Sequence, residues 1–135
     1  MEDIRSKSLM LLVALFFIIA PGAGIASSMQ ETKVQLQSDL QKHIYRSLVN
    51  GAYHTLDSTT GEVRALYPHV SHPMILKMGD YFVMCADFRD ANGNDVDIDF
   101  YMIKQNKRFL VFRAEIDNHQ LLDGFMKSGK AKIYQ

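Results

Sequence analysis

The chain has little of several things that small proteins commonly use to fold or to bind. It contains a single cysteine among 135 residues, so no disulfide can form within it. Its 15 Lys and Arg residues balance 15 Asp and Glu residues, and a net charge of zero lacks the long-range field that draws proteins to nucleic acid. It also has no Asn-x-Ser/Thr glycosylation signal. With 47% hydrophobic and 22% charged residues, the composition is still that of a folded globular domain.

Only one long apolar run is present, and it lies near the N-terminus. Arg5 and Lys7 precede twelve consecutive apolar residues, 9–20, and small residues then occupy positions −3 and −1 of a cut before Ser27. This layout predicts a secretory signal peptide, residues 1–26, that is cleaved on export. The alternative is an uncleaved membrane anchor, but twelve helical residues span about 18 Å, which is short of a hydrocarbon core of about 30 Å.

The sequence after this run predicts an exported protein of one domain. Residues 27–33 are polar and are expected to form a flexible leader, and residues 34–135 to form a single small domain without a stable membrane anchor. Small exported domains often depend on disulfides, which this chain cannot form. Together with the missing glycosylation signal, this favours the bacterial periplasm over a eukaryotic secretory compartment.

An amphipathic helix is predicted over residues 34–49. Leu36, Leu40, Ile44 and Leu48 recur every four residues, so they share one face of a helix, while the opposite side is polar. The dipeptide Asn50-Gly51 is a typical helix stop.

Residues 52–80 predict shorter and less regular structure. Turn-forming residues 57–61 separate two short strands, 53–56 and 62–67. Pro68 and Pro73 are expected to prevent regular structure between them. Residues 74–76 then form another short strand.

The clearest pattern lies in residues 81–116, where three runs alternate apolar and polar side chains. The runs cover 81–89, 95–104 and 108–116, and Asn92-Gly93 marks the first turn. If each loop has three residues, every position on one face of this antiparallel meander is apolar. The first loop then sets Phe88 opposite Val96, and the second loop, 105–107, sets Phe100 opposite Phe112.

The C-terminal residues predict a short helix. Asn118 is placed to cap a helix over residues 119–127, with Leu122 facing inward and Gly129 as its stop. Residues 131–134 form either a last strand or a loose tail. The whole chain therefore predicts an α+β fold. An N-terminal helix packs on an antiparallel sheet made of the 81–116 meander and shorter strands from 52–77, followed by a short C-terminal helix.

The other face of the meander carries polar and aromatic side chains that could bind a partner. We expect this candidate face to contain Asp87, Asp97, Asp99, Tyr101, Phe109, Arg113 and Glu115. The predicted register places Asp87, Asp97 and Glu115 in one row, and Arg113 opposite Asp99. Opposed like charges destabilise a sheet unless a cation or a basic partner offsets them. The alternative is a solvated face whose acids point into water and contribute little.

One segment, residues 69–85, is rich in soft metal ligands. It predicts a copper or zinc site formed by His69, His72 and Cys85, with Met74 or Met78 as a weak fourth ligand. The alternative is that the methionines fill the core and the cysteine is a small hydrophobe, because the spacing matches no specific metal motif.

The sequence contains no recognisable catalytic motif. Cys85 sits in mid-strand beside a predicted carboxylate, which disfavours its thiolate and with it nucleophilic catalysis. We therefore expect a small exported binding or accessory protein, without enzymatic activity, for an unknown protein or small-molecule partner. The alternative is a periplasmic copper- or zinc-binding protein. A nucleic-acid partner is not expected.

Overall fold

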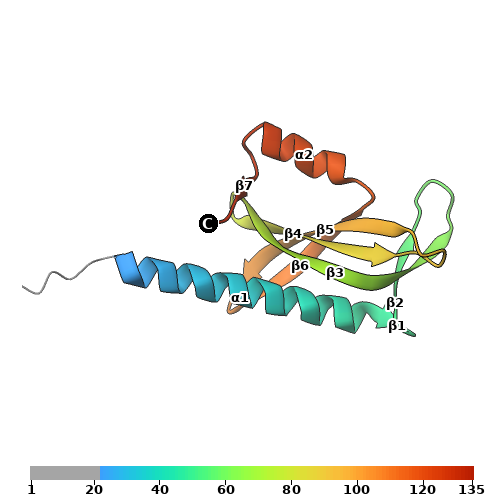
Figure 1. Ribbon diagram of the computed structural model, residues 1–135, viewed down its shortest axis with the longest axis horizontal. Coiled ribbons are helices and arrows are strands. Elements are labelled where there is room, and N and C mark those ends of the chain that lie inside the picture. Colours follow the sequence, from blue (N-terminus) through green and yellow to red (C-terminus); the bar gives the residue numbers. More distant parts are fainter. Residues whose placement is uncertain (1–21) are drawn as a thin grey trace, which may run out of the picture.

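The computed structural model describes residues 22–135 and shows one antiparallel sheet between two helices (Figure 1). The elements are α1 (Gly22–Ser47), β1 (Leu48–Val49), β2 (Ala52–Leu56), β3 (Val63–Met78), β4 (Tyr81–Arg89), β5 (Asp95–Gln105), β6 (Arg108–Ile116), α2 (His119–Lys127) and β7 (Lys132–Ile133). Strands β1 to β6 lie side by side in chain order, and β7 pairs with β3. The predicted α+β class, with a helix on an antiparallel sheet and a short C-terminal helix, is confirmed.

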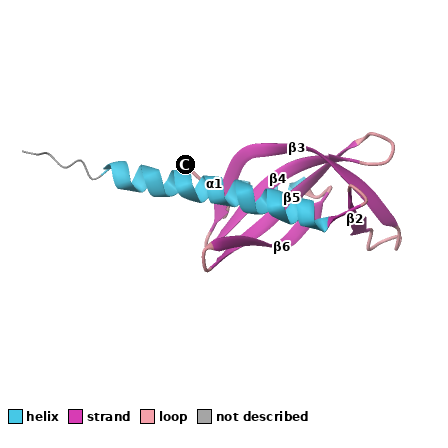
Figure 2. Ribbon diagram, turned by 90° about the horizontal axis from the view of Figure 1, so that it is seen from below, coloured by secondary structure: helices cyan, strands magenta, loops and turns pink. Residues whose placement is uncertain are grey.

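Helix α1 runs across one face of the sheet (Figure 2) and buries the predicted apolar stripe. Leu36, Leu40 and Ile44 are 0 to 5% exposed. The helix begins at Gly22 rather than at Val34, so residues 27–33 are helical. Side chains such as Gln, Glu and Lys favour the helix even where they are exposed, and this extends α1 beyond its buried stripe. It ends at Ser47, and β1 and β2 then join through a turn at Asn50-Gly51.

The predicted signal peptide falls almost wholly outside the described part of the chain. Residues 1–21 are not described, and a cut before Ser27 would lie inside α1 as the structure has it. Within residues 22–135, no helix combines the length and the hydropathy needed to cross a bilayer.

The prediction that Pro68 and Pro73 interrupt regular structure is wrong. Both lie within β3, a continuous strand of 16 residues. Strand β2 pairs with residues 63–66 and β7 with residues 76–77, so between these stretches β3 pairs only with β4. A proline on such an open edge removes no ladder hydrogen bond, and two register shifts in the β3–β4 pairing take up the remaining irregularity.

The first hairpin of the meander has the predicted register, with Phe88 opposite Val96. The second hairpin does not have the predicted register. Its turn contains two residues, Asn106 and Lys107, because Asn106 adopts a positive φ of 57° that suits a tight hairpin turn. A bulge at Phe112 then restores the alternation further along β6.

The two faces of the sheet therefore carry two separate apolar clusters. The larger lies under α1 and includes Phe88, Phe100 and Phe109. The smaller lies under α2 and includes Val83, Tyr101 and Leu122. The face under α2 is the one that carries the acidic side chains.

Candidate metal centre

Two neighbouring strands place a thiol beside a buried carboxylate. Cys85 of β4 and Asp99 of β5 are directly opposite each other in the register, and alternation directs both to the α2 face. Cys85 is 8% exposed and Asp99 only 1% exposed.

Helix α2 adds an imidazole to this pair. After β6 the chain turns at Asp117, whose φ is 53°, and folds back over the sheet (Figure 1). Leu122 is fully buried and anchors the helix to the sheet. His119, the first residue of α2, lies against Asp99, with its Nδ1 atom 3.3 Å from Asp99 Oδ2. Three side chains from three elements therefore meet at one point.

The side chains of Cys85, Asp99 and His119 are close enough together to share a metal ion. One potential ligand atom from each side chain lies within 4.8 Å of the other two. Two ligands at bond lengths of about 2.0 Å in a tetrahedral zinc site are about 3.3 Å apart, which is the distance between His119 Nδ1 and Asp99 Oδ2. The other ring nitrogen, Nε2, lies 3.6 Å from Asp123 Oδ1. At this distance Asp123 is a charged neighbour of the ring and not a hydrogen-bond partner.

Asp99 carries an oxygen that nothing in the described part of the chain satisfies. Its Oδ1 atom is buried and has no hydrogen-bond partner, and the same is true of the hydroxyl of Tyr101 on the same face of β5. A buried polar atom without a partner costs about 1–3 kcal/mol. Both atoms lie on the face of β5 that α2 covers, two residues apart.

The thiol of Cys85 is held in its protonated form. Burial raises its pKa, and the neighbouring carboxylate of Asp99 raises it further, followed by the charges of Asp97 and Asp87. A thiol with this pKa is neutral at physiological pH and is a poor nucleophile. A bound cation would offset the negative charges that suppress its ionisation.

Negative charge is concentrated around this group. Burial and the adjacent Asp87 raise the pKa of Asp97, whereas a hydrogen bond with His72 lowers that of Asp87. A hydrogen bond from Asn118 and the neighbouring Arg113 lower the pKa of Glu115. The surroundings thus favour a positive ligand.

The structure does not bring His69 and His72 together with Cys85. His69 Nε2 lies 3.0 Å from Arg89, and His72 Nε2 lies 2.9 Å from Asp87 Oδ2. Of the methionines, Met74 is 41% exposed and Met78 packs on the cluster under α2. Among the described residues, only the group of Cys85, Asp99 and His119 has three such ligands within 4.8 Å.

The candidate binding face differs from the prediction because of the shifted β6 register. Glu115 lies opposite Asp99, not opposite Asp97, and Arg113 lies opposite Tyr101, not opposite Asp99. Asp87 and Asp97 do face each other as expected. Phe109 belongs to the other face, where it packs under α1.

Sequence reasoning missed His119 as a ligand. The helix that carries it was predicted with the correct bounds, but Asn118 does not cap it through its side chain, which instead donates to Glu115. The pattern of Leu122 and Phe125 indicated that one face of α2 is buried. That pattern could have placed His119 near the sheet, although not beside Asp99.

Comparisons with protein-family models, curated proteins and solved structures give no match for this chain. Its function must therefore be inferred from the geometry and chemistry of the site itself.

Proposed function

We propose that this chain is an exported protein that binds a divalent transition-metal ion, zinc in the first place, through Cys85, Asp99 and His119. The observation that carries the proposal is that one ligand atom from each of Cys85, Asp99 and His119 lies within 4.8 Å of the other two, while the second carboxylate oxygen of Asp99, Oδ1, is buried without a partner. Compared with the metal site expected from the sequence, this site retains Cys85 and has Asp99 and His119 in place of His69 and His72.

The ligand set favours zinc over copper. Zinc accepts thiolate, imidazole and carboxylate in one tetrahedral site. Cu(I) prefers thiolates and thioethers to a carboxylate. Three protein ligands leave the fourth position of a tetrahedral ion to water or to a partner's side chain.

The same features support a binding or accessory role rather than catalysis. The protonated thiol is a weak nucleophile, and the surrounding carboxylates repel anionic substrates. A metal ion whose fourth coordination position is left to water or a partner suits storage, or transfer to that partner, by an exported protein. The apolar run at residues 9–20, followed by small residues before Ser27, supports export to the bacterial periplasm.

The test is a titration of the full chain with Zn²⁺ against a chromophoric chelator, with a parallel titration with Cu²⁺. We expect binding near one ion per chain. Cys85→Ser, Asp99→Asn and His119→Gln should each weaken it about 10- to 100-fold or more, since each removes a ligand.

Two matched variants distinguish the site at Asp99 and His119 from the site at His69 and His72 that the sequence predicts. His69→Ala and His72→Ala also remove a histidine, but outside the group, and should leave zinc affinity unchanged. Zinc binding that survives His119→Gln but is lost in His72→Ala would refute the proposed site in favour of the other. No binding by the correctly folded chain would refute both.

A further inference from the structure

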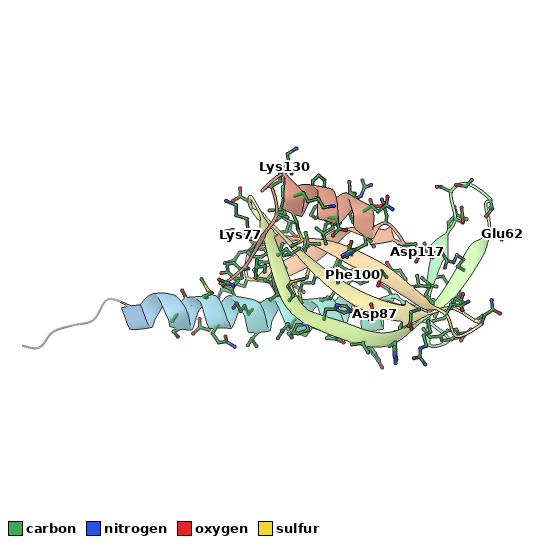
Figure 3. All side chains as sticks on the ribbon, turned by 45° about the horizontal axis from the view of Figure 1, so that its top comes forward. Glu62, Lys77, Asp87, Phe100, Asp117 and Lys130 are labelled. Atoms are coloured by element: carbon green, nitrogen blue, oxygen red, sulfur yellow. The ribbon has the colours of Figure 1, made fainter. Side chains whose placement is uncertain are left out.

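The zero net charge conceals a separation of charge along the molecule. In Figure 3, Lys77 and Lys130 lie at one end, whereas Glu62, Asp87 and Asp117 lie toward the other. The antiparallel topology explains this, because the β3–β4 turn, the β5–β6 turn and β7 share one end and the β4–β5 turn lies at the opposite end.

The end that holds these turns is rich in bases, and we call it the basic end. It comprises Lys33, Lys77, Lys104, Lys107, Arg108, Lys127, Lys130 and Lys132. Glu31 and Asp80 are the acids there, together with Asp39, which lies near Arg108 and is buried. Within residues 22–135, the Lys and Arg residues that form ion pairs are Lys42, Arg64, Arg89 and Arg113, all outside the basic end. Among the described residues, the lysines of the basic end form no ion pair with a carboxylate, while Arg108 lies near Asp39.

Contacts with aromatic rings hold several of these lysines close together. The ammonium groups of Lys33 and Lys77 each lie 5.9 Å from the ring of Tyr134, and Lys77 pairs with Lys132 across β3 and β7. The ammonium group of Lys104 lies 5.9 Å from the ring of Phe109. The basic end is thus one continuous surface formed by α1, β3, β5 and β7.

Apolar side chains are exposed among these bases. Five large ones, between 36 and 54% exposed, lie on the elements that form this end: Val34, Tyr81, Ile103, Leu110 and Ile133. Lysines interleaved with exposed aliphatic and tyrosine side chains are typical of surfaces that bind at the interface of a bilayer. Nucleic-acid surfaces favour arginine and stacked aromatic rings instead.

The first turns of α1 belong to the same end of the molecule. They project beyond the sheet on the side where β7 and the C-terminus lie (Figures 1 and 2).

We infer that the basic end docks on a membrane surface rich in anionic lipid, with the metal-binding group and its acids facing away from the bilayer. Each lysine near an anionic surface strengthens binding about fivefold. The inserted Val34, Tyr81 and Ile133 side chains would add contact with the acyl boundary. This surface is independent of the metal site, so either proposal can fail alone.

The chain contains no tryptophan, so a single introduced tryptophan reports on its own surroundings. We would compare full-length Ile133→Trp, at the basic end, with Leu56→Trp, an exposed position at the opposite end. Vesicles of neutral phosphatidylcholine are compared with vesicles enriched in phosphatidylglycerol. We expect a blue shift of the Ile133→Trp emission with anionic vesicles that high salt reverses, and none for Leu56→Trp.

Charge-reversal substitutions then test whether lysines of the basic end contribute to vesicle binding. In the Ile133→Trp background, Lys132→Glu and Lys107→Glu should each weaken binding to anionic vesicles at least about fivefold. Lys107 lies in an exposed turn, so its substitution does not disturb the core. Arg46→Glu, the same charge change toward the other end of α1, should have little effect.

Three outcomes would overturn the inference. The first is an equal shift with neutral and anionic vesicles, which would show that the charge of the lipid does not drive binding. The second is an unchanged affinity in both lysine variants. The third is displacement from the vesicles by a short DNA duplex at equal phosphate concentration, which would indicate a general polyanion site.

Discussion

At the scale of single residues, the thiol of Cys85 determines how metal binding should depend on pH. Its pKa is raised by burial and by the carboxylate of Asp99, so the thiol carries its proton throughout the neutral range. A metal ion binds the thiolate and must release that proton. We therefore expect zinc affinity to rise about tenfold for each pH unit between neutral and mildly alkaline pH, because one proton is exchanged for the ion.

Calorimetry in buffers of different ionisation enthalpy measures this released proton directly. Cys85→Ser supplies the control, because the residual affinity from Asp99 and His119 involves no thiol proton. A pH-independent affinity in the unsubstituted chain would show that Cys85 does not ligate the ion as a thiolate.

At the scale of elements, one buried carboxylate ties α1 to the sheet. Asp39 is 6% exposed and accepts hydrogen bonds from the backbone N–H of Phe109, at 2.9 Å, and from Gln35. Burial acts to raise its pKa, but the Phe109 and Gln35 hydrogen bonds and the nearby Lys42 outweigh this effect, and the net shift is downward. A carboxyl group with a lowered pKa in the folded state stabilises the fold above its unfolded pKa of about 4. That contribution is lost as the pH falls through the folded value.

Asp39→Ala should therefore lower the free energy of unfolding by about 1–3 kcal/mol at neutral pH, because it leaves the Phe109 N–H buried without an acceptor. Urea denaturation measures the change. Lys42→Ala is the matched control on the same helix, since its ammonium group is 3.8 Å from Asp39 and largely exposed, and it should cost under about 1 kcal/mol. The stabilising effect of Asp39 should also shrink in acid, and an equal effect at every pH would contradict the charge argument.

The strands show how far the sequence alone predicts this fold. Alternation in residues 81–116 predicted the three strands, the first hairpin register and the apolar face, because a slip of one residue would have buried charges. The same logic failed for β6, since a two-residue turn combined with a bulge at Phe112 also buries apolar residues. Local pattern cannot distinguish two registers that are equally apolar on one face.

The candidate site was less predictable than the strands. Cys85 and Asp99 were placed as direct neighbours by the first register, which the structure confirms. The third ligand, His119, depends on how α2 folds back after the turn at Asp117. That contact is a tertiary one, and neither spacing nor composition encodes it. The sequence also could not show that His69 lies against Arg89 and His72 against Asp87, because these contacts are made between strands.

At the scale of the whole molecule, the proposed metal ion would link three elements whose ligands are separated in the sequence. Cys85 lies on β4, Asp99 on β5 and His119 on α2. Helix α2 is otherwise held to the sheet mainly by its apolar face around Leu122, and its N-cap residue makes no capping hydrogen bond through its side chain. Coordination of His119 would therefore fix the least supported end of α2.

Zinc should consequently stabilise the fold and protect α2. At free zinc about 100-fold above the Kd, a single site adds about 2.7 kcal/mol, which raises Tm by roughly 10 °C in a domain of this size. Hydrogen exchange should slow in residues 119–127 more than in β1 and β2, which lie far from the ion along the sheet. Chelation should reverse both effects, and Asp99→Asn should abolish them. A rise in Tm that persists in His119→Gln would mean that zinc binds elsewhere, and a rise without added protection of α2 would mean that the helix is already fixed by Leu122.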